Sequence, residues 1–405
     1  MTEQSARWWE DRATERARLR RHLEIITEAR PEIAVDTGGS DDLADMRHLH
    51  RDGAILVRDA DLPRVAEIVP GDVERSLING VTLYRPHGLD TETALDRIDR
   101  ALGIGVATPD HALHITPAGC CPASEPEEVE LGPSPKVNTD KASNGDGVSV
   151  SVVDTGFLPS LVDARHQWLE GVKGDNERVH PPYIRPFEGH GTFVAGIVRC
   201  LAPAADVHVD GFLTNGGTIF ESEIITQLDQ ALNRVPDIIS LSAGTLTRHN
   251  LPPLSFEVFW ENRLRHYKGT VLVAAAGNDH HRGPFWPAAF PWALSVGALD
   301  THDERAPFTN YGSWVDVYAP GADIVNAFPD GVYIYQEPPH EGTVHEFKHG
   351  MARWSGTSFS TPIVSGMIAQ RMSATGETAR QAADALLEKA RANTRPHVGA
   401  ILKPT

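Results

Sequence analysis

The segment that most constrains the fold of this chain is residues 356–362, with the sequence Gly-Thr-Ser-Phe-Ser-Thr-Pro. It stands directly before an apolar run at residues 363–368. Small residues before such a run predict a tight turn that opens a buried helix, with Ser358 at the helix start. Backbone N–H groups lack partners there and the helix dipole is positive, so an oxyanion beside Ser358 would be stabilised. The segment alone is also consistent with an ordinary N-cap.

Two upstream segments supply an acid and a base. Residues 148–153 (Val-Ser-Val-Ser-Val-Val) predict a buried strand that ends at Asp154, and open α/β sheets carry functional groups at that end of their strands. His190 begins the run 190–198, whose apolar residues and glycines predict a closely packed helix. The order acid, base, nucleophile along the chain is one of the three orders known for serine hydrolases.

A fourth segment lies between the base and the nucleophile. Residues 270–276 (Thr-Val-Leu-Val-Ala-Ala-Ala) predict a buried strand, and Gly277 and Asn278 follow it. The Asn278 amide at this position is a candidate hydrogen-bond donor to an oxyanion.

On these motifs the chain resembles the subtilisin family of serine peptidases (subtilases, S8-type) over about residues 147–405. The resemblance implies that Asp154 orients the base, His190 is the general base and acid, Ser358 is the nucleophile and Asn278 is the oxyanion-hole donor. It implies an α/β fold, a three-layer sandwich with a mostly parallel central sheet. The implied activity is endopeptidase hydrolysis through an acyl-enzyme, and it should fall at acid pH because His190 acts as a base only when neutral.

The resemblance also implies the substrate cleft. Residues 237–244 resemble the family strand that lines the cleft and pairs with an extended peptide. The expected substrate-binding residues are small, and they are Ser242, Ala243, Gly244, Ala275, Ala276 and Gly277. Their size predicts a roomy first pocket that accepts large apolar side chains, unless Phe285 and Trp286 narrow it.

Two other motifs point to different peptidase classes. A second Asp-Thr-Gly begins at Asp36, and together with Asp154 it would supply the two carboxylates of an aspartic peptidase. A polar stretch follows Asp36, which disfavours this interpretation. His345 to His349 read His-Glu-Phe-Lys-His, the pattern that binds zinc when it lies on a helix. Prolines and glycines surround it, so we expect residues 329–353 to form an inserted loop or hairpin with no metal site.

The N-terminal part predicts a second, smaller domain. Residues 51–116 predict the order β-α-β-β-α-β of a ferredoxin-like α+β unit, with an Asn-Gly hairpin turn at 79–80. A unit of this kind before a subtilase resembles the propeptide that inhibits it, so we expect an intramolecular inhibitor. Residues 1–50 predict a charged helical segment, and residues 117–146 an acidic, protease-accessible linker. We expect self-cleavage between about Thr116 and Glu125.

Bulk properties bound the partners. The formal charge of −18 argues against nucleic acid and anionic membranes, and no apolar run reaches transmembrane length. The N-terminus lacks a signal-peptide apolar region, and three cysteines make no disulfide framework, so we expect a cytoplasmic protein with protein or peptide substrates. No cofactor is expected to be required. Structural calcium, common among relatives, stays open, with Asp163, Asp175 and Asp206 as candidate ligands.

Two other function classes remain open at this point. One is a catalytically silent relative that only binds. The other is a subtilase-like acyl transfer, such as peptide macrocyclisation, which would release a cyclic product.

Overall fold

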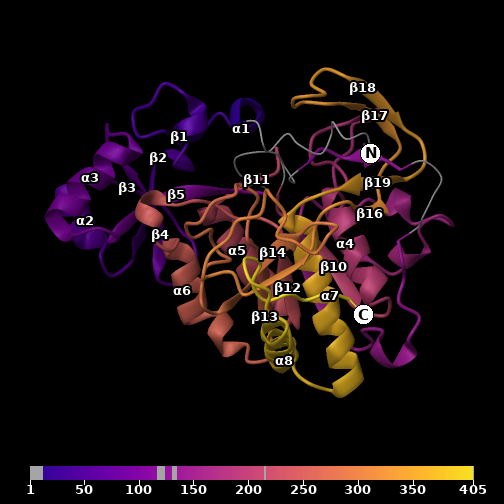
Figure 1. The fold of residues 1–405 in the computed structure, drawn as a ribbon. Helices are drawn as coiled ribbons and strands as arrows, with labels where there is room; N and C mark the ends of the chain where they lie inside the picture. Colours follow the sequence, from indigo (N-terminus) through magenta and orange to yellow (C-terminus); the bar gives the residue numbers. More distant parts are fainter. Residues whose placement is uncertain (1–11, 116–123, 130–134, 214–215, 405) are drawn as a thin grey trace.

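A parallel sheet forms the centre of the C-terminal part (Figure 1). The computed structural model describes residues 12–115, 124–129, 135–213 and 216–404. Within them this sheet has seven strands in the order β15-β14-β13-β12-β7-β10-β8, and every neighbouring pair is parallel. The predicted α/β architecture with a mostly parallel sheet is therefore confirmed. The strands are β7 (Ser149–Asp154), β8 (Lys173–Gly174), β10 (Asp206–Gly211), β12 (Ile238–Leu241), β13 (Val271–Ala275), β14 (Ala293–Leu299) and β15 (Val317–Pro320).

Helices cover both faces of this sheet. Successive side chains of a strand point to opposite faces, and the neighbours Val152 and Val153 accordingly belong to two different hydrophobic cores. The core of Val152 includes residues of α4 (His190–Leu201), α7 (Thr357–Thr375) and α8 (Ala379–Ala392). The core of Val153 includes residues of α5 (Glu221–Ala231) and α6 (Leu254–Asn262). Burial on both faces explains why β12 and β13 are nearly continuous apolar runs.

The N-terminal part forms an antiparallel sheet with two helices. Its elements follow the order β-α-β-β-α-β, and the strands pair as β5-β2-β4-β3. Apolar residues of α2 and α3 pack on β2, β4 and β5 to form a separate core. The elements are β2 (His48–Arg58), α2 (Leu62–Ile68), β3 (Gly71–Ser76), β4 (Val81–Pro86), α3 (Thr91–Leu102) and β5 (Ala107–His114).

The expectation of a helical segment over residues 1–50 is wrong beyond residue 29. Helix α1 (Arg12–Ala29) ends just before Pro31, which cannot continue a helix. Strand β1 (Ile33–Asp36) then pairs antiparallel with β2, which already begins at residue 48.

The two parts of the chain share backbone hydrogen bonds. Strand β11 (Thr218–Phe220), which lies between β10 and α5 in sequence, pairs antiparallel with β5. The sheet of the N-terminal part thus takes one strand from the C-terminal part, and Figure 1 shows β11 at the end of β5.

The insertion before α7 is a hairpin, as predicted. Strands β17 (Gly331–Ile334) and β18 (Val344–Phe347) pair antiparallel, and β17 also pairs with β9 (Tyr183–Ile184). Beside it, β19 (Met351–Trp354) pairs with β16 (Ile324–Ala327). Figure 1 shows the hairpin at the upper edge of the molecule, far from α2 and α3.

The linker expectation is wrong for its described middle part. Residues 124–129 are packed rather than accessible: β6 (Glu127–Glu128) pairs antiparallel with β19, and Val129 is 5% exposed. An unpaired edge of β19 offers backbone hydrogen bonds to any extended neighbour, which composition alone does not reveal.

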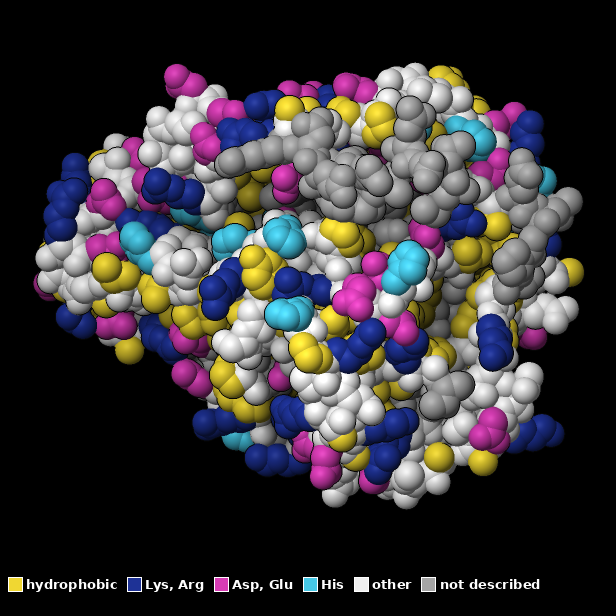
Figure 2. Space-filling view, viewed as in Figure 1, with side chains coloured by type: hydrophobic (Ala, Val, Ile, Leu, Met, Phe, Trp, Pro, Cys, Tyr) yellow, Lys and Arg dark blue, Asp and Glu magenta, His cyan; other side chains and the backbone are white. Residues whose placement is uncertain are grey.

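The surface carries charges of both signs. Figure 2 shows basic and acidic side chains interspersed over the face seen in Figure 1. No helix among the described residues combines the length and the apolar composition that crossing a bilayer would need.

We predict that Phe193→Ala lowers the free energy of unfolding by about 3–5 kcal/mol, because it empties a fully buried site. The Phe193 ring centroid lies 4.8 Å from that of Phe359 and 5.6 Å from that of Trp354. Equilibrium urea unfolding measures the loss. Phe193→Leu, which keeps most of the volume, is the control and should cost less than about 1.5 kcal/mol. Equal losses in the two variants would contradict this packing.

Candidate active site

A buried carboxylate–imidazole pair stands at the carboxyl edge of the parallel sheet. Asp154 is the last residue of β7, and His190 is the first residue of α4. Asp154 Oδ1 lies 2.6 Å from His190 Nδ1, and neither residue is exposed. The same carboxylate oxygen also accepts a hydrogen bond from the backbone N–H of Thr155. A carboxylate can only accept, so Nδ1 carries the proton, and Nε2 is left as the basic nitrogen.

The basic nitrogen of His190 is free to act. Nε2 is buried and has no hydrogen-bond partner within the described part of the chain. The ring is held from two sides, with its centroid 5.4 Å from the rings of both Trp354 and Phe359. Next to it, a Cβ on Gly191 would lie 2.3 Å from the carbonyl oxygen of Gly156, so only glycine allows this close approach.

Asn278 is fixed by the residue next to Ser358. Its Oδ1 accepts hydrogen bonds from Thr357 N at 2.9 Å and from Thr357 Oγ1 at 3.0 Å. These two donors orient the amide so that Nδ2 stays unpartnered and buried among the described residues. A preorganised, desolvated N–H donor beside a nucleophile is what stabilisation of an oxyanion requires.

Ser358, in the first turn of α7, faces the N-terminal part of the chain. Its Oγ lies 3.4 Å from the carbonyl oxygen of Ser242 and 3.5 Å from that of Ile115. The Ser242 hydroxyl in turn donates to the Ser358 carbonyl at 3.1 Å. The carbonyl of Ile115 is therefore held beside the predicted nucleophile.

The end of β5 lies in the predicted cleft as an extended strand. His114 and Gly244 exchange two backbone hydrogen bonds of 3.0 Å each. On the other side, Ile115 N donates to Gly217 O at 2.9 Å. The segment is therefore hydrogen-bonded along both of its edges. Its partner on one edge is Gly244, a predicted substrate-binding residue.

The ring of Phe285 narrows the space beside two of the predicted substrate-binding residues, Gly244 and Gly277. A Cβ on Gly244 would lie 2.3 Å from the Phe285 ring, and a Cβ on Gly277 would lie 3.0 Å from it. Phe285 is 1% exposed, so its ring fills the space that these small residues leave. Among the other small residues, Ser242, Ala243, Ala275 and Ala276 are also buried.

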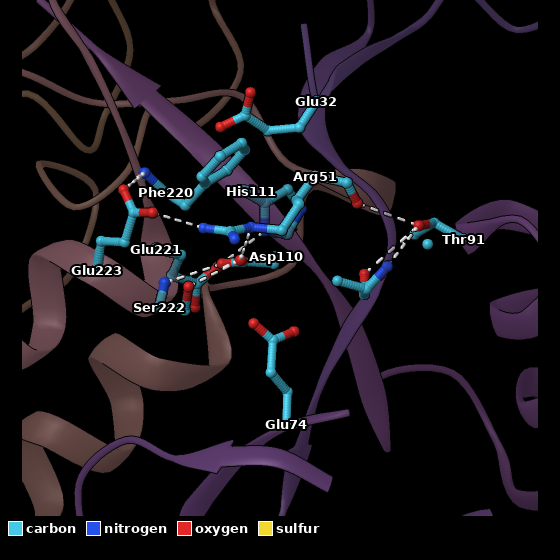
Figure 3. A network of polar contacts seen from close by, with 12 residues as sticks. Glu32, Arg51, Glu74, Thr91, Asp110, His111, Phe220, Glu221, Ser222 and Glu223 are labelled. Carbon is cyan, nitrogen blue, oxygen red and sulfur yellow. Dashed lines mark hydrogen bonds and ion pairs between the residues drawn. The ribbon is translucent and has the colours of Figure 1, made fainter. Parts of the chain in front are cut away.

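A buried polar network, which sequence reasoning missed, joins β5 to the helix α5 (Figure 3), and it continues to the helix α6. Asp110 of β5 accepts hydrogen bonds of 2.8 Å from both N and Oγ of Ser222, in the first turn of α5. Glu221 does the same for Ser255 at the start of α6, and its second oxygen lies 2.9 Å from His111 Nδ1. Burial raises the pKa of Asp110 and of Glu221 to about 7. Each carboxylate thus caps the positive end of a helix.

Arg51 supplies the positive charge of this network. Its Nε lies 3.0 Å from Asp110 Oδ2, and its second terminal nitrogen lies 2.6 Å from Glu223. The sequence held one signal for this site, because Asp110 and His111 are polar residues inside a strand that is buried throughout.

The alternative peptidase motifs do not form sites. Asp36 contacts His48 at 3.3 Å and Asp154 contacts His190, so the two Asp-Thr-Gly motifs are not one carboxylate pair. Glu346 of the His-Glu-x-x-His motif lies on a strand and pairs with Lys348, so the helix that zinc binding needs is replaced by β18.

The candidate calcium ligands make separate contacts. Asp163 binds Arg165, Asp206 binds Lys173, and Asp175 accepts from Gly211 N. Among the described residues, one group of three side chains could hold a metal ion, and it consists of His48, His50 and Glu92. Their ligand atoms lie within 4.8 Å of one another. Arg248 already holds Glu92 at 2.9 Å.

Comparisons with known proteins identify the family of residues 145–401. The sequence profile of the Subtilase family matches residues 145–401. The thermophilic serine proteinase of Bacillus sp. (strain AK1) is 31% identical over 246 residues, which are 57% of this chain and 53% of that protein. This chain therefore matches only about half the length of that relative.

Two solved structures extend the comparison. Fervidolysin from Fervidobacterium pennivorans, a keratinolytic enzyme related to subtilisin, has a TM-score of 0.57 and 18% identity, and it covers 87% of this chain and 60% of its own. At that identity the likeness shows the fold alone. A mutant of the protease domain of PatA has a TM-score of 0.51 and 26% identity, and it covers 66% of this chain and 95% of its own.

We predict that Glu177→Gln stabilises the protein at alkaline pH relative to the wild type. Glu177 accepts a hydrogen bond from Gly189 N at the start of α4, and burial raises the pKa of its carboxyl to about 8. A carboxyl whose folded pKa is raised stabilises the fold fully below its ordinary pKa. That contribution is lost as the pH rises from about 4.5 to 8.

Urea unfolding at several pH values tests this loss. The wild type should lose stability relative to Glu177→Gln at up to about 1.4 kcal/mol per pH unit. The exposed Glu170→Gln is the charge-matched control and should follow the wild type. Parallel profiles of wild type and Glu177→Gln would contradict the prediction.

Proposed function

Because this chain belongs to the subtilase family, we propose that it is a serine endopeptidase with Asp154, His190 and Ser358 as its catalytic triad. The observation that carries the proposal is the buried contact of 2.6 Å between Asp154 and His190, which leaves Nε2 unpartnered among the described residues. Protein or peptide substrates follow from the family.

The proposed reaction uses side chains of this chain alone. Ser358 Oγ attacks the peptide carbonyl while His190 Nε2 takes the hydroxyl proton, and Asp154 stabilises the imidazolium that forms. Asn278 Nδ2 donates to the oxyanion. His190 then gives the proton to the leaving amine, which departs as the acyl-enzyme on Ser358 forms. A water molecule reverses these steps to release the acid.

We further propose that the N-terminal part is an intramolecular inhibitor of the ferredoxin-like type. The β-α-β-β-α-β order and the strand order β5-β2-β4-β3 support this assignment. The extended residues at the end of β5 support inhibition, because they take both edges of the cleft and bring the Ile115 carbonyl to 3.5 Å from Ser358 Oγ. A substrate cannot pair with Gly244 while His114 does.

We propose the same division of the chain that the sequence predicts. Residues 51–116 would form most of the inhibitor and residues 147–405 the peptidase, and residues 117–146 would connect them, with residues 124–129 packed on β19. The bonds expected to be cut lie between about Thr116 and Glu125, and residues 116–123 of that span lie outside the described residues.

We predict that Ser358→Ala abolishes fluorophosphonate labelling and peptide hydrolysis. Ser360→Ala, which removes a buried neighbouring hydroxyl that donates to Ala319 O, is the control and should keep labelling. Labelling that persists in Ser358→Ala would overturn the proposed nucleophile. Cyclic products from a linear peptide would indicate acyl transfer instead of hydrolysis.

We predict that Asn278→Ala lowers kcat while KM changes little, because the amide acts on the oxyanion and not on the bound substrate. Loss of one such donor in a subtilisin costs about 10²–10³ in kcat, and we expect the same range. Steady-state kinetics on a fluorogenic peptide measure both constants. A loss confined to KM would assign Asn278 to substrate binding.

We predict that the wild type processes itself and that Ser358→Ala stays intact. Intact-mass spectrometry of both purified proteins, with N-terminal sequencing of the wild type, locates the cut. Identical intact masses would contradict self-processing and leave a permanently attached inhibitor.

A further inference from the structure

The inserted hairpin carries a surface rich in hydrogen-bond donors. This surface is formed by the hairpin strands β17 and β18, by the neighbouring strand β19 and by the residues that join them. We call it the insertion surface (residues 331–354). Its donors toward residues 124–128 are two tyrosine hydroxyls, a tryptophan N–H, a histidine N–H and three backbone N–H groups, and they belong to Tyr333, Tyr335, Gln336, Glu337, His345, Lys348 and Trp354. A surface made of donors selects a ligand made of acceptors.

The chain's own linker residues provide those acceptors. Trp354 Nε1 donates to Ser124 O at 2.6 Å, and the Tyr335 hydroxyl donates to Pro126 O at 3.1 Å. The next two residues, Glu127 and Glu128, form β6, which pairs with β19. The ligand is thus held as an added β-strand, a mode in which the backbone supplies affinity and side-chain pockets supply specificity.

Two pockets receive acidic side chains. Glu125 accepts hydrogen bonds from the Tyr333 hydroxyl at 2.9 Å, from Gln336 N at 2.8 Å and from Glu337 N at 3.2 Å. The neighbouring Glu337 carboxylate forms an ion pair with Arg18 of α1 at 2.9 Å, which offsets its charge. Each of the two side chains is 5% exposed.

The second pocket binds the Glu128 carboxylate as an anion. Glu128 Oε2 lies 2.9 Å from His345 Nε2, its Oε1 accepts from Lys348 N at 2.8 Å, and His349 Nε2 lies 3.8 Å away. Burial alone would raise the pKa of Glu128, but the hydrogen bonds from Lys348 N and His345 hold it below its ordinary value. The two histidines that mimic a zinc motif in the sequence therefore face a carboxylate.

The insertion surface leads directly to the proposed nucleophile. Strand β19 ends four residues before Ser358, and Ser355 N donates to Ser124 Oγ at 3.1 Å. Ile115, on the other side of the undescribed residues 116–123, lies at Ser358 itself. A peptide that pairs with β19 therefore lies on the C-terminal side of the bond that is expected to be cut.

We propose that the insertion surface is a binding site for extended acidic peptide segments, which the chain's own Ser124–Val129 occupies in the resting protein. Once this segment leaves, the site takes a substrate segment on the C-terminal side of the scissile bond, with an acidic residue at the position of Glu128. This use in substrate choice rests on the proposed peptidase function, but binding of the peptide does not.

A binding experiment that needs no catalysis tests the proposal. The full chain carries Ser358→Ala and Glu128→Gln, which weakens its own occupant, and fluorescence anisotropy follows a labelled peptide with the sequence of residues 124–129, Ser-Glu-Pro-Glu-Glu-Val. We expect this peptide to bind at least tenfold more tightly than one with Gln in place of Glu128. A peptide with Gln in place of the exposed Glu127 is the matched control and should bind like the original.

Variants of the protein complete the test. In the same chain, His345→Ala should remove the preference for Glu at that position, whereas His340→Ala, an exposed histidine of the same hairpin, should keep it. Equal binding of all three peptides, or no binding to the folded chain, would overturn the proposal. Failure of Ser358 labelling would overturn the peptidase function alone and leave this result unaffected.

Discussion

The arrangement of the whole molecule depends on the backbone hydrogen bonds of one strand, β5. It pairs with β2 inside the N-terminal sheet, and it pairs with β11 on its other edge. Its last residues then pair with Gly244 and Gly217 and reach Ser358. One continuous strand therefore belongs both to the core of the N-terminal part and to the cleft. The two parts cannot separate without breaking this ladder, and full separation also requires a cut in the chain that follows it.

Buried charge reinforces the same strand. Asp110 caps α5 and Glu221 caps α6, and His111 of β5 contacts Glu221. These groups have little access to water, so each depends on its partners to offset the cost of desolvation. If the N-terminal part left, Ser222 and the start of α5 would lose Asp110, and Arg51 would lose Glu223. The contact is thus specific for this strand in this register, which a purely apolar interface would not require.

The sequence predicted those features that arise from short, contiguous patterns. Strand β7 before Asp154, helix α4 at His190 and helix α7 at Ser358 each follow from local apolar runs with small or polar residues at their ends, and the hairpin at 331–347 follows from its prolines and glycines. The contact of Asp154 with His190 was predicted only through the family resemblance. Periodicity alone placed the two residues on separate elements, and the catalytic roles stay predictions.

Features made by distant pairing were beyond the sequence. The sequence around Asp110 and Glu221 does not indicate which helix each carboxylate caps, because the capped helix is a different element of the chain in each case. Residues 124–129 have the composition of a solvated linker, yet they are ordered by the edge of β19, more than 200 residues later. Composition describes what a segment does in water, whereas an open strand edge decides what it does in this fold.

The docked linker also changes how release of the cleft should proceed. A cut between residues 116 and 123 would free the end of β5, but it would leave Ser124–Val129 on the insertion surface, where α1 supports the hairpin through Arg18 and Glu337. Because α1 belongs to the N-terminal part, departure of that part removes the cation that neutralises Glu337. Glu125 and Glu337 would then face each other as two close carboxylates, and like charges in a partly buried site repel. Loss of the N-terminal part should therefore weaken the binding of Ser124–Val129 to the insertion surface. The end of β5 would leave the cleft first, and the linker segment would leave after it.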